Sequence, residues 1–239
     1  MAAERWLGTP CTVAHLSTIS ERLSFILSVI GSNRCLRMLD VGTGLGVYIQ
    51  PLMPYCSLYM ATDINRLNLE RVRKNEANAE LGVVAAERLP FADGSFDIVL
   101  LIEVLEHVVD DRSVLSEVHR VLRPDGKFIF TLPNKLFPFE MHALKGSNGI
   151  FGFKYGVPFL PYLPESIRNR ITTARVYRLK DVSKIIESQF SIEAVRYFLP
   201  DLDGSKPMIR NLVRRFQAVA EHELLRWFLP HIMVSSRRL

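Results

Sequence analysis

Cysteine is scarce in this 239-residue sequence, which contains three: Cys11, Cys35 and Cys56. No two of them form a C-x-x-C pair, and none stands at a metal-ligand spacing from a histidine. The cysteines therefore predict neither a disulfide framework nor a zinc site, and we expect a reducing compartment and no bound metal.

Long apolar runs are also missing, because charged residues or proline interrupt the most apolar stretches, as at Glu103, Glu106, Arg226 and Pro230. A membrane-spanning helix needs about 20 consecutive apolar residues, and residues 1–5 lead into no such run. We therefore expect a cytoplasmic protein that is neither secreted nor membrane-spanning. With 48% hydrophobic and 23% charged residues, the whole chain is expected to fold as a single globular domain.

Most of the chain has no net charge, and the excess of basic residues is confined to its last segment. Residues 205–239 hold seven Lys or Arg against two Glu, which accounts for the whole net charge of +5. Ser205 as an N-cap and Pro207 just after it predict an amphipathic helix in this tail. A basic amphipathic helix indicates peripheral contact with an anionic membrane, although a solvated helix face or a helix packed on the sheet is an alternative.

Short apolar runs alternate with helical segments through the first half of the sequence. A capping box, Thr18-Ile-Ser-Glu21, predicts the start of a first helix that ends at Gly31. Strands are expected at 36–41, 58–62, 83–86, 96–102, 127–132, 190–198 and 232–236, and further helices at 47–53, 65–79, 110–122 and 180–188. This alternation predicts an α/β fold with a doubly wound, mostly parallel, seven-stranded sheet.

Two segments, residues 133–178 and 200–230, interrupt the alternation. The first contains several prolines and glycines without a clear period, so we expect an irregular insertion and no sheet element there. We interpret both insertions as a lid over an acceptor. The apolar residues of the first are enough to line an acceptor pocket or, equally, to form a small core of their own: Leu136, Phe137, Phe139, Met141, Phe151, Phe153, Tyr155, Phe159, Leu160 and Tyr162.

A glycine-rich turn, Asp40-Val-Gly-Thr-Gly-Leu-Gly46, follows the first expected strand. Glycines let a ligand approach the backbone closely, and the carboxylate of Asp40 can receive an ammonium group. Asp63, at the end of the second strand, suits the paired hydroxyls of a ribose. A nucleoside pocket is predicted. A dinucleotide site would share these features, but its fingerprint requires a glycine where this chain has Val47.

Several motifs follow the glycine turn at defined spacings: Leu39-Asp-Val-Gly-Thr-Gly-Leu-Gly46, Leu89-Pro-Phe91, Ser95-Phe-Asp-Ile-Val99, Leu105-Glu-His-Val108 and Arg120-Val-Leu-Arg-Pro-Asp-Gly126. In order and spacing they resemble the class I S-adenosylmethionine-dependent methyltransferases of the ubiquinone/menaquinone-methylase-like group, methyltransferase type 11. The resemblance covers about residues 36–132, which would form the cofactor-binding core.

The resemblance implies S-adenosyl-L-methionine as the cofactor. The family pattern places the methionine portion on the glycine turn, the ribose at the end of the second strand, the adenine before Leu89, and the methyl group at the end of the fourth strand. The residues so implied are Asp40, Gly42, Gly44, Gly46, Asp63, Ile64, Ala86, Glu87 and Ile102. Where the family often has an acidic residue for the adenine amine, this chain has Ala85. Glu87 or the backbone of Ala86 would then substitute, unless Glu87 is simply solvent-exposed.

Two histidines are candidate catalytic residues. Methyl transfer from a sulfonium chiefly requires two aligned reactants, but an oxygen acceptor must also lose a proton. His107 lies just beyond the fourth strand, and its ordinary pKa is near neutrality. His142 in the first insertion, with Glu140 nearby, is the second candidate. A packing or helix-capping role for His107 and a surface-loop position for His142 are the alternatives.

The acceptor class follows from motifs that are missing. The fourth strand ends in Ile102-Glu-Val-Leu-Glu-His107 and not in the Asp/Asn-Pro-Pro-aromatic motif of base-amine methylases. No cysteine stands where a pyrimidine C5 methylase needs its nucleophile. We therefore expect a small or lipid-like acceptor, methylated at oxygen or carbon, more than nucleic acid. An RNA or protein methyltransferase, or a cofactor-binding partner protein without catalysis, stays open.

Overall fold

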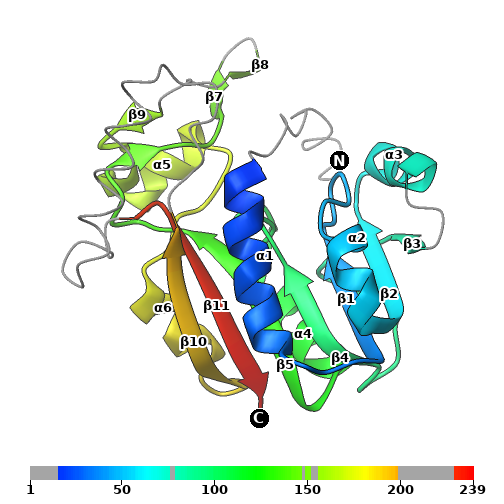
Figure 1. Cartoon of the computed structure of the whole chain (residues 1–239). Coiled ribbons are helices and arrows are strands. Elements are labelled where there is room, and N and C mark those ends of the chain that lie inside the picture. The colour runs from blue at the N-terminus through cyan, green and yellow to red at the C-terminus, as the bar shows by residue number, and fades with distance from the viewer. Residues whose placement is uncertain (1–15, 76–78, 147–148, 152–155, 199–228) are drawn as a thin grey trace.

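The computed structural model describes residues 16–75, 79–146, 149–151, 156–198 and 229–239 of the chain. Its centre is a seven-stranded sheet in the order β10-β11-β5-β4-β1-β2-β3. β11 runs antiparallel to both of its neighbours, and the other neighbouring strands are parallel. The predicted doubly wound, mostly parallel sheet is therefore confirmed (Figure 1). The strands are β1 (Leu36–Val41), β2 (Cys56–Asp63), β3 (Glu80–Val83), β4 (Phe96–Leu101), β5 (Leu122–Pro133), β10 (Phe190–Phe198) and β11 (His231–Arg238).

Helices cover both faces of the sheet, and each face has its own apolar core. Successive side chains of a strand point to opposite faces, so Met38 and Leu39 of β1 belong to different cores. One core includes residues of α1, α2 and α3, and the other includes residues of α4 and α6 (Figure 1). The helices are α1 (Leu16–Ile30), α2 (Ile49–Leu52) with the 3₁₀ turn η2 (Met53–Tyr55), α3 (Arg66–Asn75), α4 (Asp111–Val121) and α6 (Leu179–Ile186).

Helix α4 shows how the sequence fixes the loop that precedes it. The side chain of Asp110 accepts hydrogen bonds from the backbone N–H groups of Arg112 and Ser113, which satisfies two of the free donors at the helix N-terminus. The apolar residues on one face of α4 are buried: Val114, Leu115, Val118 and Val121. The loop between β4 and α4 is therefore fixed at one end by the sheet and at the other by the Asp110 cap.

Two local predictions are wrong. The third strand was expected at 83–86 but β3 is Glu80–Val83, because Glu80 pairs with Met60 and the following apolar residues leave the sheet. Thr18 was expected to cap the first helix, yet α1 already includes Leu16, so Thr18 lies inside the helix. Both differences arise from pairing or packing that a local pattern does not encode.

The first insertion contains sheet elements, contrary to the prediction. Strand β6 (Phe139–Glu140) pairs with β9 (Val157–Pro158), and β7 (Leu144–Gly146) pairs with β8 (Gly149–Phe151). Strands this short have no period that the sequence can reveal. The 3₁₀ turn η3 (Leu160–Tyr162) and helix α5 (Glu165–Ile171) complete the insertion, which follows the carboxyl end of β5 (Figure 1).

The second insertion and the predicted basic helix lie outside the described residues, except for their last positions, Leu229 and Pro230. In the part of the chain that the structure describes, every helix is too short or too polar to cross a bilayer.

Candidate functional site

The glycine turn after β1 has the backbone that the sequence predicts for a close ligand approach. Gly42, Gly44 and Gly46 all have positive φ angles, of 76°, 57° and 73°, a region that favours glycine. A Cβ atom on residue 42 would overlap the side chain of Val104, which follows β4. A Cβ atom on residue 44 would meet nothing within 4 Å. The backbone at Gly44 therefore borders open space, as a cradle for a ligand requires.

Asp40, in β1 just before this turn, has a fully buried side chain. Its Oδ2 accepts hydrogen bonds from Thr43 Oγ1 at 2.7 Å and from the Tyr59 hydroxyl at 3.0 Å. Burial raises the pKa of Asp40 to about 6, although these two hydrogen bonds act in the opposite direction. An approaching cation would favour the ionised form of this carboxyl group.

Asp63 connects the end of β2 to the glycine turn. Its Oδ2 accepts a hydrogen bond from the Gly44 backbone N–H at 2.9 Å, and its Oδ1 accepts one from the Asn65 backbone N–H at 2.7 Å. Asn68 Nδ2 lies 3.2 Å from Oδ2. The structure thus holds the Asp63 carboxylate beside Gly44, and its role toward a ribose stays a prediction.

The other residues implied to contact the cofactor have mixed positions. Ile64 is 55% exposed beside Asp63, whereas Ala86 and Ile102 are buried. Glu87 Oε1 accepts a hydrogen bond from the Val109 backbone N–H at 3.1 Å. Glu87 is thus tied to the loop after β4, and its role toward adenine stays a prediction.

The loop after β4 begins with a charged residue in an unusual conformation. Glu103 has a φ of 58°, which is uncommon for a residue other than glycine and often marks a functional position. Its backbone N–H donates to Thr131 Oγ1 at 2.7 Å. Its Oε1 lies 2.7 Å from Arg22 Nη2 of α1 and 3.3 Å from His231 Nδ1 of β11. Burial opposes ionisation, but Arg22 and His231 overcome it and hold the pKa of Glu103 well below its ordinary value.

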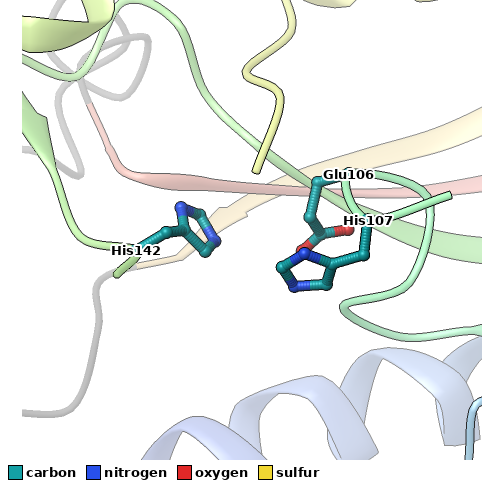
Figure 2. A group of neighbouring side chains, drawn as sticks. All are labelled: Glu106, His107 and His142. Atoms are coloured by element: carbon teal, nitrogen blue, oxygen red, sulfur yellow. The ribbon is translucent and has the colours of Figure 1, made fainter. Parts of the chain in front are cut away.

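Glu106, His107 and His142 form a three-residue cluster, in which one possible ligand atom of each lies within 4.8 Å of the others. Figure 2 shows the ring of His142 directed toward Glu106 and His107 from the opposite side. The two histidine rings meet edge to face, with 5.8 Å between their centroids. The structure therefore brings together the two histidines predicted as catalytic candidates, although 34 positions separate them in the sequence.

Burial and mutual proximity shift the titration of all three cluster residues. Burial, together with the Glu103 carboxylate, raises the pKa of Glu106 to about 8. Burial and the neighbouring His142 lower the pKa of His107 to about 4. Burial alone would lower the pKa of His142, but the hydrogen bond with Glu140 and the nearby Glu106 raise it instead. Ionisable groups with strongly shifted pKa values are typical of functional sites.

Residues of the insertion hold the cluster in place. Glu140, itself 1% exposed, accepts hydrogen bonds at Oε1 from the His142 backbone N–H at 3.0 Å and from His142 Nδ1 at 2.7 Å. The Arg175 backbone N–H donates to the Glu106 carbonyl oxygen at 3.0 Å. The Tyr177 hydroxyl donates to the Leu105 carbonyl oxygen, also at 3.0 Å. The insertion therefore helps to build the site.

Sequence reasoning missed Glu103, Glu106 and Glu140 as members of the site. A signal was present for the first two. They are acidic residues that follow an apolar strand directly, at the edge where open α/β sheets bind ligands. Glu140 was noticed only as a neighbour of His142, because its buried position depends on the pairing of β6 with β9.

Comparisons with known proteins identify the family to which this chain is similar. A family model described as a methyltransferase domain matches residues 39–130. The ubiquinone/menaquinone biosynthesis C-methyltransferase UbiE of Citrifermentans bemidjiense is 30% identical over 195 residues, which are 75% of this chain and 79% of that protein. The ubiquinone biosynthesis O-methyltransferase of Parvibaculum lavamentivorans is 29% identical over 122 residues, which are 49% of this chain. The chain spans about half the length of that relative, 48%.

A solved structure shows the same fold. The S-adenosylmethionine-dependent methyltransferase from Mesorhizobium loti superposes with a TM-score of 0.61 and 18% sequence identity. The match covers 90% of this chain and 96% of that one. At this identity the likeness concerns the fold alone.

Proposed function

The chain belongs to the class I S-adenosylmethionine-dependent methyltransferases of the ubiquinone/menaquinone-methylase-like group, and from this membership we propose that it methylates an oxygen or carbon atom of a lipid-like acceptor. One contact is the main support. The overlap between a side chain at position 42 and Val104 means that the glycine turn touches the loop bearing Glu106 and His107. The methyl donor and the groups that prepare the acceptor would then be neighbours.

The residues of the glycine turn fit the cofactor. Gly44 offers backbone beside open space, the Asp63 carboxylate accepts a hydrogen bond from its N–H, and the Asp40 carboxylate accepts one from the preceding Thr43. S-adenosylmethionine supplies an electrophilic methyl group on a sulfonium. With the cofactor bound, His107 or His142 would accept the proton that the acceptor loses when it takes the methyl group. The chain's main contribution is alignment in a site shielded from water.

Two observations support a lipid-like acceptor. The relatives from Citrifermentans and Parvibaculum are named for ubiquinone or menaquinone biosynthesis. The first insertion also exposes large apolar side chains, with Phe159 68%, Tyr162 48% and Phe139 40% exposed. Exposed aromatic side chains of this kind suit an apolar partner or ligand.

Methyl-labelled cofactor tests this proposal directly. The protein is incubated with labelled S-adenosylmethionine and, separately, with lipid, small-metabolite and RNA extracts. We expect label in the lipid fraction. Label in RNA or in protein would overturn the acceptor class, and binding of S-adenosylhomocysteine without label in any fraction would indicate a partner protein without catalysis.

Substitution of the histidines tests the proposed roles of His107 and His142. His107→Ala should lower turnover about 10²-fold while the affinity for S-adenosylhomocysteine stays nearly unchanged. The matched control is His119→Ala, because His119 is half-buried on α4 and contacts Phe190 instead of the cluster. Full activity of His107→Ala combined with a large loss in His142→Ala would assign the proton transfer to His142.

Peripheral membrane contact through the predicted basic helix of the tail, which precedes β11, remains part of the proposal. Each basic residue near an anionic surface contributes about 1 kcal/mol, a gain that salt weakens. The protein should therefore sediment with anionic vesicles at low salt and less at high salt. Changing Arg210, Arg214 and Arg215 together to Glu should abolish sedimentation. Equal sedimentation with neutral vesicles would argue against this contact.

A further inference from the structure

We propose that Glu106, His107 and His142 bind a divalent first-row transition-metal ion, with Zn²⁺ as the best fit. The three side chains offer two imidazole nitrogens and a carboxylate within 4.8 Å of one another. They come from two separate segments, the loop after β4 and the first insertion, and point toward a common centre (Figure 2). Two histidines and one carboxylate are a donor set that such ions prefer.

Glu106 provides an independent indication of a ligand. The residue is 2% exposed, and neither carboxylate oxygen has a hydrogen-bond partner among the described residues. Buried carboxyl groups are ordinarily hydrogen-bonded or coordinate a metal, since leaving them unmatched is unfavourable. The adjacent Arg22 does not provide the missing partner, because its guanidinium pairs with Glu103. A cation between Glu106 and the histidines would.

Neighbouring groups hydrogen-bond both histidine rings in the way that groups around a metal site orient its ligands. His142 Nδ1 is engaged by Glu140 at 2.7 Å, which leaves Nε2 as the nitrogen for coordination. The His107 ring hydrogen-bonds the backbone of Thr173. Metal-bound histidines almost always direct their second nitrogen at a carboxylate or a backbone carbonyl, which fixes the ring and its tautomer. Both histidines of this cluster do so.

The donor set also selects among cations. Mg²⁺ and Ca²⁺ prefer oxygen ligands, and the cluster supplies only one oxygen-bearing side chain. Three protein ligands leave coordination positions open, as in catalytic and not in structural zinc sites. Resting on the proposed function, the ion would orient an acceptor hydroxyl opposite the methyl donor and lower its pKa, so that its proton leaves to water; the two histidines would then act as ligands in place of direct proton acceptors.

Metal binding is measurable without knowledge of the acceptor. Protein stripped with a chelator is titrated with Zn²⁺, and separately with Mg²⁺, by calorimetry, and Co²⁺ is added as a spectroscopic probe. We expect one Zn²⁺ per chain, much weaker Mg²⁺ binding, and a Co²⁺ absorption spectrum that indicates nitrogen ligands. Glu106→Gln, His107→Ala and His142→Ala should each weaken Zn²⁺ binding at least 100-fold, and Glu140→Gln 10- to 100-fold.

Controls separate this inference from misfolding and from the proposed function. His119→Ala should bind Zn²⁺ like the wild type, and S-adenosylhomocysteine affinity shows whether each variant is folded. Absence of Zn²⁺ and Co²⁺ binding by the wild type would overturn the inference. Zn²⁺ binding that is unchanged in the cluster variants would also overturn it, because the ion would then be bound by residues outside the cluster, such as His15 or His222. Methyl transfer that proceeds fully in metal-free protein would leave a bound ion without the proposed role, whereas an inactive protein that binds Zn²⁺ would contradict only the methyltransferase proposal.

Discussion

Gly42 and Val104 are in such close contact that a single added carbon atom at position 42 would overlap the Val104 side chain. This contact joins the glycine turn after β1 to the loop after β4, which bears Glu106 and His107. The arrangement is possible because β1 and β4 are parallel neighbours, so both loops leave the same edge of the sheet. The packing of two loops thereby places two functional groups side by side.

Comparison of Gly42→Ala with Gly44→Ala tests this contact. Both residues have positive φ angles, which a non-glycine residue adopts at a cost of about 1–2 kcal/mol. Only alanine at 42 also overlaps a neighbour. Gly42→Ala should therefore destabilise the protein more than Gly44→Ala, by about 1–3 kcal/mol further, in chemical denaturation. Equal destabilisation by the two variants would mean that the loops do not touch.

The pKa of Asp40, raised to about 6 by burial, predicts pH-dependent cofactor affinity. The ammonium group of S-adenosylhomocysteine should favour the ionised carboxyl group. Affinity is then constant above about pH 7 and falls as the pH drops through 6, about tenfold by pH 5. The free protein should show the opposite trend, because a folded pKa above the unfolded one gives a stabilisation that is lost as the pH rises through about 6.

Calorimetry in buffers of different ionisation enthalpy checks the Asp40 prediction. Binding near pH 6 should release protons from the wild type. Asp40→Asn removes the titrating group and should bind weakly with no step near pH 6. A step that persists in this variant would assign the pH dependence to another group.

Much of the sheet was predictable, because residues close to the ends of most strands mark in the sequence where each strand stops. Asp40 and the glycines follow β1, and Phe190–Phe198 matches the predicted sixth strand. The third strand was predicted too far along the sequence because Val83 to Ala86 are all apolar. Only the pairing of Glu80 with Met60 sets the register of β3. Local sequence specifies that a strand exists more firmly than which residues pair.

The site was predictable where its residues follow strands and not where distant segments meet. Asp63 and His107 were proposed from their positions at the end of β2 and beyond β4, and the structure places them there. The meeting of His142 with Glu106 depends on the fold of the insertion, where two-residue strands hold Glu140 in place. A contact of this kind depends on tertiary packing and has no periodic trace in the sequence.

Asp63→Ala tests the ribose-binding role of that carboxylate. Hydrogen bonds to a charged group contribute about 1.5–3 kcal/mol, so affinity for S-adenosylhomocysteine should fall about 10- to 100-fold. Asn68→Ala is the matched control, because it removes one donor to Asp63 and leaves the carboxylate with Gly44 and Asn65. Calorimetry that gives equal affinities for Asp63→Ala and the wild type would remove Asp63 from the pocket.

Replacement of Arg22 tests the ion pair that supports the loop after β4. Arg22 Nη2 lies 2.7 Å from Glu103 Oε1, and the Arg22 and Glu103 side chains are 9% and 31% exposed. Arg22→Met leaves the Glu103 carboxylate without its main partner. Removing one partner of a fully buried pair costs about 3–5 kcal/mol, and the partial exposure of Glu103 reduces our expectation to about 1–3 kcal/mol at pH 8.

The pH dependence and a double variant make the Arg22 prediction specific. The pKa of Glu103 is depressed in the folded protein, so its stabilisation is present above the ordinary glutamate pKa and is lost as the pH falls below it. The deficit of Arg22→Met should therefore shrink toward acidic pH, as Glu103 becomes protonated in the variant. Adding Glu103→Gln should restore part of the stability at pH 8, because the unpaired charge is gone. Denaturant unfolding at pH 5 and pH 8 measures both effects, and a deficit that is the same at both pH values and in the double variant would show that Arg22 stabilises the loop by packing alone.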